Sequence, residues 1–233
     1  MPVSLVEPSV AEKWNAILES GSDKAYPTLE LVRLERWYWG GAKGRVLEYG
    51  FGCGANLIHL LKCGHEVDAI DVSPAAKVMV ERKLAALTLP GHASLTLLPT
   101  DAQRLPYDDG IFDYVSCLSV LSLLASRQRV ERLLAEFLRV MRPGGKLIAD
   151  INSPNSDFAR GSQCAGDGVY LYRGSSGTDA PVPTYCPSTV SEFVSLFGGY
   201  HVDDVGYAAH KYGPSEIHEY LVCASKPCDD AHG

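Results

Sequence analysis

The 233-residue sequence lacks long apolar runs, because its purely apolar stretches are only a few residues long. A membrane-spanning helix needs about 20 consecutive apolar residues, so no membrane span or membrane partner is expected. The first residues, MPVSLVEPSVAEKW, have neither a basic start nor an apolar core. A secretory signal is therefore not expected either, and these absences predict a cytoplasmic protein.

Positive charge is in deficit. The chain has 21 Lys and Arg against 28 Asp and Glu, which gives a formal net charge of −7 at pH 7. Nonspecific binders of nucleic acid usually carry a basic face. The composition therefore argues against a nucleic-acid partner.

Paired cysteines are also missing, because the seven cysteines are odd in number and none of them form a C-x-x-C pair. This pattern is typical of reduced thiols in a cytosolic protein. A zinc site needs several ligands close together. No such cluster occurs along the sequence, so we expect no metal site.

Short apolar runs alternate with helical stretches from Arg45 onward, which predicts a parallel sheet with right-handed crossovers in a single α/β domain. Two closing strands with a short turn at 213–215 should pair antiparallel. The expected strands are 45–50, 66–72, 94–100, 112–121, 146–151, 200–208 and 217–225. The expected helices are 11–19, 29–39, 55–64, 74–87, 126–141 and 188–197.

Glycines alternate at Gly50, Gly52 and Gly54, between a predicted strand and a predicted helix. Glycine allows a tight turn and a close approach of the backbone to a ligand. The first helical turn, around Asn56, adds unpaired N–H groups and the positive end of the helix dipole. The loop therefore predicts a site for an anionic or polar ligand. It also fits a dinucleotide fingerprint that ends at Ala55.

Acidic residues follow or end the first three strands and narrow the choice of ligand. Glu48 would repel a pyrophosphate, but it can hold an ammonium group directly or through water. Asp71 can accept hydrogen bonds from both hydroxyls of a ribose, whereas Asp68 should face the other way because its spacing along the strand is odd. Asp101 can accept the amine of an adenine, and the N–H of Ala102 can donate to the adjacent ring nitrogen.

Taken in order, these motifs resemble the class I S-adenosylmethionine-dependent methyltransferases of the small-molecule type. The similarity covers about residues 44–151. Its carriers are Glu48-x-Gly50-x-Gly52-x-Gly54, Asp71, Asp101-Ala102, Leu105-Pro106, Phe112-Asp113 and 141-MRPGGKL-147.

The resemblance implies a Rossmann-like, doubly wound, mostly parallel seven-stranded sheet of order 3-2-1-4-5-7-6 with an antiparallel last strand. It implies S-adenosyl-L-methionine as the cofactor and S-adenosyl-L-homocysteine as the product. The methyl acceptor would be an oxygen, nitrogen or sulfur nucleophile of a small molecule. The implied cofactor-binding residues are Tyr26, Glu48, Gly50, Gly52, Gly54, Asn56, Asp71, Val72, Asp101, Ala102, Leu118 and Ser119.

We expect an N-terminal helical cap at 1–43 and a methyltransferase domain at 44–226, with a substrate-side insertion at about 152–188 and a tail at 227–233. Methyl transfer is an in-line displacement that depends mainly on alignment. A general base is needed only for a nucleophile that is protonated at working pH. No diagnostic catalytic motif occurs, and Tyr26 and His210 are the candidates.

Two alternatives stay open from the sequence. The same fold could serve a nicotinamide-dependent oxidoreductase, because Gly50, Gly52, Ala55 and Asp71 permit it. The chain could also bind S-adenosylmethionine without turnover. The sequence indicates neither the acceptor nor the oligomeric state.

Overall fold

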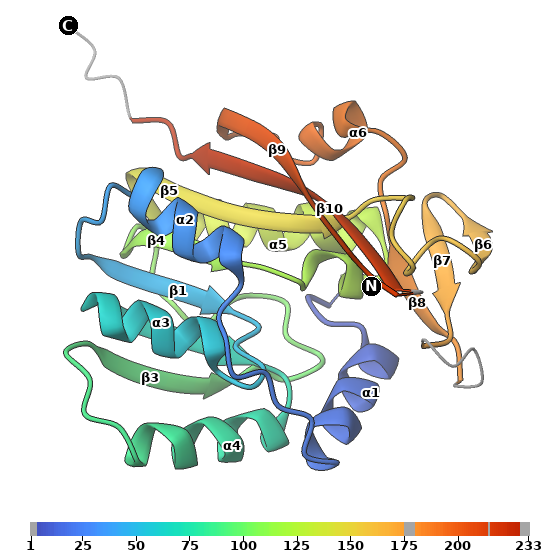
Figure 1. The fold of residues 1–233 in the computed structure, drawn as a ribbon. Helices are drawn as coiled ribbons and strands as arrows, with labels where there is room; N and C mark the ends of the chain where they lie inside the picture. The colour runs from blue at the N-terminus through green and yellow to red at the C-terminus, as the bar shows by residue number, and fades with distance from the viewer. Residues whose placement is uncertain (1–3, 175–179, 214, 229–233) are drawn as a thin grey trace, which may run out of the picture.

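Seven strands form the central sheet of the molecule (Figure 1). They are β1 (Arg45–Tyr49), β2 (Glu66–Asp71), β3 (His92–Leu97), β4 (Phe112–Cys117), β5 (Met141–Asn152), β9 (His201–Tyr212) and β10 (Ser215–Ser225). Their order is β3-β2-β1-β4-β5-β10-β9. Strand β10 pairs antiparallel with both β5 and β9, and the other neighbours pair parallel. The predicted order and the antiparallel last strand are confirmed.

The structure is a computed structural model that describes residues 4–174, 180–213 and 215–228. Parts of the predicted turn at 213–215, the predicted insertion at 152–188 and the predicted tail at 227–233 therefore lie outside the described residues. Within the described ranges, no helix is long and apolar enough to cross a membrane.

Helices cover both faces of the sheet. They are α1 (Pro8–Glu19), α2 (Leu29–Trp37), α3 (Ala55–Cys63), α4 (Pro74–Ala85), α5 (Arg127–Val140), α6 (Val190–Val194) and the 3-10 helix η1 (Leu121–Leu124). Because side chains alternate along a strand, Val46 packs in one core and its neighbour Leu47 in the other. The first core lies under α2, α3 and α4, and the second lies under α5 and α6.

Helix α5 has the strongest sequence signal, and the structure confirms it. The hydroxyl of Ser126 caps the helix by accepting the N–H of Arg129 at 3.3 Å. Its apolar residues Val130, Leu133, Leu134 and Phe137 form a stripe that is buried in the second core. The helix ends at Val140 and β5 starts at once with Met141. The predicted strand at 146–151 therefore begins five residues earlier than expected, and Pro143 lies inside it.

The structure corrects the ends of two expected elements and the content of one region. Strand β4 ends at Cys117, because the chain turns at Ser119, which has a φ of 60°, and enters η1. Helix α6 ends at Val194, short of the predicted residue 197. The region 152–188, which shows no period in the sequence, holds a second sheet. It consists of β6 (Gln163–Gly166), β7 (Val169–Tyr172) and β8 (Val182–Tyr185).

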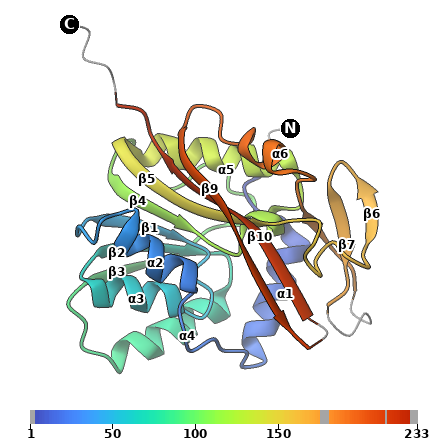
Figure 2. The ribbon, with the colours of Figure 1, turned by 45° about the horizontal axis from the view of Figure 1, so that its top comes forward.

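The small sheet lies beyond the carboxyl ends of the parallel strands, on the same side of the molecule as α1 (Figures 1 and 2). Helix α1 approaches it closely, because the Lys13 ammonium lies 5.8 Å from the centre of the Tyr172 ring. The second sheet and α1 therefore flank the edge of the main sheet at which open α/β folds bind ligands.

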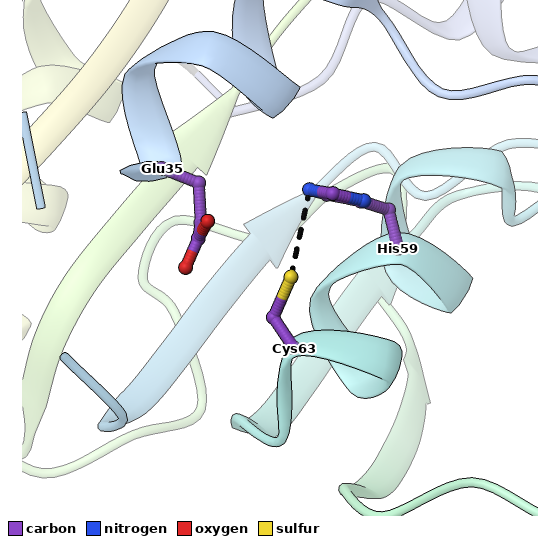
Figure 3. Close-up of side chains that lie close together, drawn as sticks. All are labelled: Glu35, His59 and Cys63. Atoms are coloured by element: carbon purple, nitrogen blue, oxygen red, sulfur yellow. Dashed lines mark hydrogen bonds between the residues drawn. The ribbon is translucent and has the colours of Figure 1, made fainter. Parts of the chain in front are cut away.

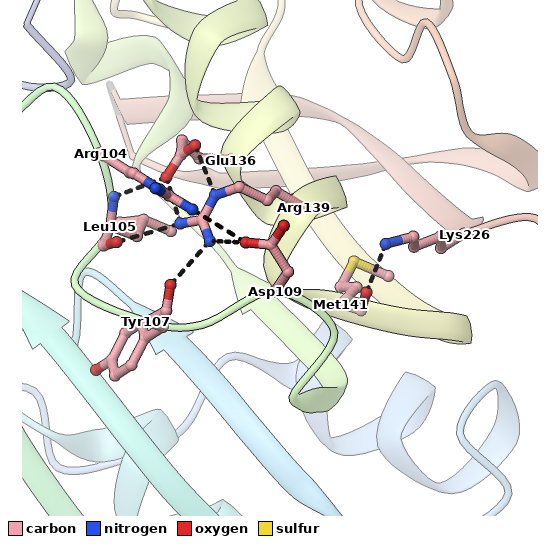
Figure 4. Close-up of polar contacts among 8 residues, drawn as sticks. All are labelled: Arg104, Leu105, Tyr107, Asp109, Glu136, Arg139, Met141 and Lys226. Atoms are coloured by element: carbon pink, nitrogen blue, oxygen red, sulfur yellow. Dashed lines mark hydrogen bonds and ion pairs between the residues drawn. The ribbon is translucent and has the colours of Figure 1, made fainter.

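An arginine on α5 fastens the long connection between β3 and β4 (Figure 4). The guanidinium of Arg139 donates to the carbonyls of Tyr107 at 2.8 Å and Leu105 at 3.1 Å. It also pairs with Glu136 and Asp109, both at 2.7 Å. This network fixes the loop that carries the predicted adenine-binding residues.

Candidate functional site

A cavity of about 410 Å³ lies outside the carboxyl ends of β1, β2 and β4. Its volume falls within the range of about 300–1,000 Å³ that is typical of small-molecule sites. One wall comes from the loops after these strands and the facing wall from α1. The lining includes seven of the twelve predicted cofactor-binding residues, namely Gly50, Gly52, Asn56, Asp71, Val72, Leu118 and Ser119.

The three glycines of the loop serve two different purposes. A Cβ on Gly50 would lie 2.4 Å from Val120, and one on Gly54 would lie 2.7 Å from Val80. These two glycines are therefore required by packing, and Gly54 does not line the cavity. A Cβ on Gly52 would meet no atom within 4 Å. Gly52 therefore leaves space open on the ligand side.

Asp71 organises the loop from the end of β2. Its Oδ2 atom accepts the N–H of Gly52 at 2.8 Å, and its Oδ1 atom accepts the N–H of Ser73 at 2.9 Å. Burial raises the pKa of Asp71, and these N–H donors act in the opposite direction. Each carboxylate oxygen can accept a second hydrogen bond, so Asp71 can receive a pair of ligand hydroxyls. The prediction that Asp68 faces elsewhere is confirmed, because it pairs with Arg45 at 2.8 Å.

Glu48 is buried at the end of β1 beneath the cavity wall, with 2% exposure. Its Oε2 atom has no hydrogen-bond partner among the described residues. Burial raises the pKa of Glu48 to about 8, and nearby Ser116 and Asn56 oppose this. Glu48 itself does not line the cavity, but Asn56 does. An orphaned buried oxygen is costly, so this carboxylate fits a cationic ligand group that reaches it directly or through water.

The end of β4 is held by a buried acid that the sequence did not single out. Asp150 of β5 is 1% exposed, and its Oδ1 atom accepts the N–H of Ser119 at 2.6 Å. Burial, and then the charge of the neighbouring Glu219, raise the pKa of Asp150 well above its usual value. Asp150 therefore fixes the left-handed backbone of Ser119 at the cavity wall.

The structure does not bring the predicted adenine contacts to the cavity. Asp101 is exposed, and neither Asp101 nor Ala102 belongs to the lining. The N–H of Ala102 donates to the carbonyl of Pro99 at 3.0 Å, and the carbonyl of Ala102 accepts the N–H of Leu5 at 2.8 Å. The N–H of Ala102 is therefore used within its own loop, and its carbonyl is used by the N-terminal segment.

The two catalytic candidates also lie outside the cavity lining. Tyr26 is 78% exposed, although the neighbouring Lys24 and Thr28 both line the cavity. His210 lies 3.3 Å from the carboxylate of Glu30. The contact that the structure assigns to His210 is therefore with the carboxylate of Glu30 on α2.

Helix α1 forms the wall of the cavity that faces the strand loops. The sequence predicted a helical cap here but did not indicate which of its residues line the cavity. Five of its residues line the cavity: Val10, Ala11, Trp14, Ile17 and Leu18. Their spacing of three and four residues marks one apolar face of a helix, so this face could have been predicted from the sequence. Asn15 pins the helix in place, because its Oδ1 atom accepts the hydroxyl of Ser73 at 2.7 Å and the N–H of Ala75 at 3.1 Å.

Comparison with known proteins agrees with this geometry. Residues 47–149 match the family model described as a methyltransferase domain. The demethylmenaquinone methyltransferase of Clavibacter sepedonicus is 28% identical over 154 residues, which are 65% of this chain and 58% of that protein. The chain therefore spans less than two thirds of the length of this curated relative.

Solved structures share the fold. A SAM-dependent methyltransferase from Methanosarcina mazei matches with a TM-score of 0.70 and 20% identity, over 80% of this chain and 94% of that chain. The 1,6-didemethyltoxoflavin-N1-methyltransferase of Burkholderia thailandensis was solved with 1,6-didemethyltoxoflavin and S-adenosylhomocysteine bound. It matches with a TM-score of 0.66 and 14% identity, over 94% of this chain and 88% of that chain.

Proposed function

We propose, from the match of residues 47–149 to a methyltransferase-domain family, that this protein is a class I S-adenosylmethionine-dependent methyltransferase that methylates a small molecule and releases S-adenosylhomocysteine. One observation carries the proposal. Asp71 and the orphaned oxygen of Glu48 lie around a glycine loop whose centre, Gly52, opens onto a cavity of about 410 Å³. These acceptor groups suit a nucleoside that also carries an ammonium group.

Each part of the wall has a proposed role toward the cofactor. Asp71 would accept the ribose hydroxyls, and the carboxylate of Glu48 would take the ammonium group past Asn56. Leu118 and Ser119 would border the methionine side. When bound, S-adenosylmethionine supplies a methyl group that its sulfonium already activates. Asp101 and Ala102 remain a prediction for the adenine, which would require the N–H of Ala102 to leave the carbonyl of Pro99.

The protein's own contribution to the reaction is alignment and exclusion of water. The apolar face of α1, with Val10, Trp14 and Ile17, lines the cavity opposite the strand loops. Alignment alone can supply effective molarities of about 10⁵–10⁸ M. We assign no proton transfer to Tyr26 or His210, because neither belongs to the lining. A nucleophile that is already unprotonated needs no base.

A small-molecule acceptor is supported by the relatives, one of which is named for demethylmenaquinone and another for a toxoflavin precursor. We further propose that 1–43 acts as a cap on a domain at 44–226, because α1 and the segment after it line the cavity. The cytoplasmic location remains a prediction.

Calorimetry of S-adenosylhomocysteine into the purified protein tests the proposal first. Micromolar binding, with no binding of NADH, would support it over the nicotinamide alternative. Labelled S-adenosylmethionine with a panel of small acceptors then separates an enzyme from a non-catalytic binder. A folded protein that binds NADH and not S-adenosylhomocysteine would overturn the proposal.

A further inference from the structure

Three side chains with metal-ligand chemistry meet away from the cavity, between α2 and α3 (Figure 3). They are Glu35 of α2 with His59 and Cys63 of α3. One ligand atom from each lies within 4.8 Å of the other two. None of the three lines the cavity. Figure 3 shows the imidazole and the thiol facing each other, with the carboxylate of Glu35 across from them.

We propose that Glu35, His59 and Cys63 bind a thiophilic divalent cation of the zinc class. The residue types are those that zinc takes in proteins, and the spacing of His59 and Cys63 puts both on one face of a helix. Bond lengths of about 2.3 Å to sulfur and about 2.0–2.1 Å to nitrogen put tetrahedral ligand atoms about 3.6 Å apart. The Cys63 Sγ and His59 Nε2 atoms are 3.7 Å apart.

A hydrogen bond from His65 orients the carboxylate of Glu35. Glu35 is 6% exposed, and its Oε1 atom lies 3.2 Å from the Nε2 atom of His65. The Nδ1 atom of His65 accepts the N–H of Gly44 at 3.3 Å. The ring proton of His65 is therefore on Nε2, where it donates to Glu35. Outer partners of this kind orient metal-binding carboxylates.

The remaining coordination position is accessible. His59 and Cys63 are half-buried, so water can complete a tetrahedral shell around three protein ligands. The Cys63 thiol loses its proton when the metal binds.

A cation at this position would join two helices that are already joined at their other ends. The N–H of Thr28, which precedes α2, donates to the Oδ1 atom of Asn56 in the first turn of α3 at 2.8 Å. Thr28 and Asn56 both line the cavity. The metal would fasten the opposite end of the same helix pair. We therefore expect a structural cation and not one that contacts substrate.

Titration of the chelator-treated full chain with Co²⁺ alone, followed by absorption, tests the proposal. We expect one equivalent of Co²⁺ with a thiolate-to-metal charge-transfer band, and displacement of the cobalt by Zn²⁺. Cys63→Ser should abolish the band. His59→Ala removes a ligand and should weaken binding by more than the roughly tenfold that loss of an outer partner costs. Cys164→Ser is the matched control and should leave both unchanged, because Cys164 is an exposed cysteine of the second sheet.

Circular dichroism and thermal unfolding establish that each variant is folded, and Glu35→Gln gives a third test if Cys63→Ser is unstable. A band that survives in Cys63→Ser but disappears in Cys164→Ser would mean that cobalt sits on exposed cysteines, and the proposal would be wrong. Failure to bind either metal in a folded wild-type protein would also overturn it. Binding of S-adenosylhomocysteine is measured separately, so either proposal can fail alone.

Discussion

The carboxylate of Asp71 accepts the N–H of Gly52 at 2.8 Å, which joins the end of one strand to the loop that follows its neighbour. The same side chain accepts the N–H of Ser73 and lines the cavity. One residue therefore shapes the glycine loop and presents acceptor atoms to a ligand. Removing it affects binding in both ways.

Replacing Asp71 by alanine should weaken S-adenosylhomocysteine binding by about tenfold or more. Hydrogen bonds to a charged group contribute about 1.5–3 kcal/mol, and 1.4 kcal/mol is a factor of about ten. Calorimetry measures the change. Asp68→Ala is the matched control, because the carboxylate of Asp68 pairs with Arg45 and lies outside the cavity. Equal affinities for wild type and Asp71→Ala would remove the ribose assignment.

Gly52→Val should abolish cofactor binding while the protein still folds. The valine side chain would extend into the open cavity, and the φ of 49° at Gly52 strains a β-branched residue by about 1–3 kcal/mol. Gly161→Val separates the two effects. Gly161 also has a positive φ, of 74°, and its Cβ would also meet nothing within 4 Å, but it lies outside the cavity.

Both variants should therefore lower the melting temperature by similar amounts, and only Gly52→Val should lose binding. The measurements are thermal unfolding and calorimetry with S-adenosylhomocysteine. Retained micromolar affinity in a folded Gly52→Val protein would show that Gly52 is not needed to keep space open for the ligand.

The helices could be predicted from the sequence because their signals are local, whereas the order of the strands in the sheet was implied by the family resemblance. The buried stripe of α5, the cap at Ser73 and the glycine at the end of α3 each lie within a few residues of the structure they specify. The strands β6, β7 and β8 have four residues each. Such strands are too short for an alternating pattern to stand out from a polar loop.

The site was predictable only where strand order determines position. Gly52, Asp71 and Ser119 come together because parallel strands end at one edge. The N–H of Ala102 was expected to be free, and its use by Pro99 depends on a local turn that the sequence does not mark. Glu35 meets His59 and Cys63 only through the packing of α2 on α3, so the spacing of four residues in α3 looked unremarkable by itself.

The buried carboxyl of Glu48 should make stability fall as pH rises. Its pKa is raised from 4.5 to about 8, so the folded state holds a proton that the unfolded state has lost between these values. Stability from this group is therefore complete below about pH 4.5 and is lost progressively up to about pH 8. Over this range the loss should reach a few kcal/mol. Urea unfolding of wild type and Glu48→Gln, compared at several pH values, measures this contribution of Glu48 to stability.

The difference in the free energy of unfolding between wild type and Glu48→Gln isolates the contribution of Glu48. The contributions of other buried acids cancel in it, among them that of Asp150, whose pKa is also raised. Wild type should lose stability relative to the variant between pH 6 and pH 8. Cofactor binding near pH 7 should also release a proton from wild type only, because an ammonium partner lowers the pKa of the carboxyl. Parallel stability curves would show that Glu48 is ionised in the folded protein.

Removing the guanidinium of Arg139 should destabilise the whole domain. Arg139 and Glu136 have side chains that are 17% and 15% exposed. Arg139→Ala would leave that carboxylate without its cation and free two carbonyls of the loop between β3 and β4. The expected loss is about 2–4 kcal/mol of the free energy of unfolding. Urea unfolding at constant pH measures it.

Arg104→Ala is the matched control, because Arg104 also pairs with Asp109 but both side chains are largely exposed, at 63% and 68%. Exposed pairs contribute about 1 kcal/mol or less, so this variant should stay within that range. Arg139→Ala should also weaken S-adenosylhomocysteine binding if the loop carries the adenine contacts, because Asp101 and Ala102 lie on it. A large loss of stability with unchanged affinity would confine the network to folding and remove those two residues from the cofactor site.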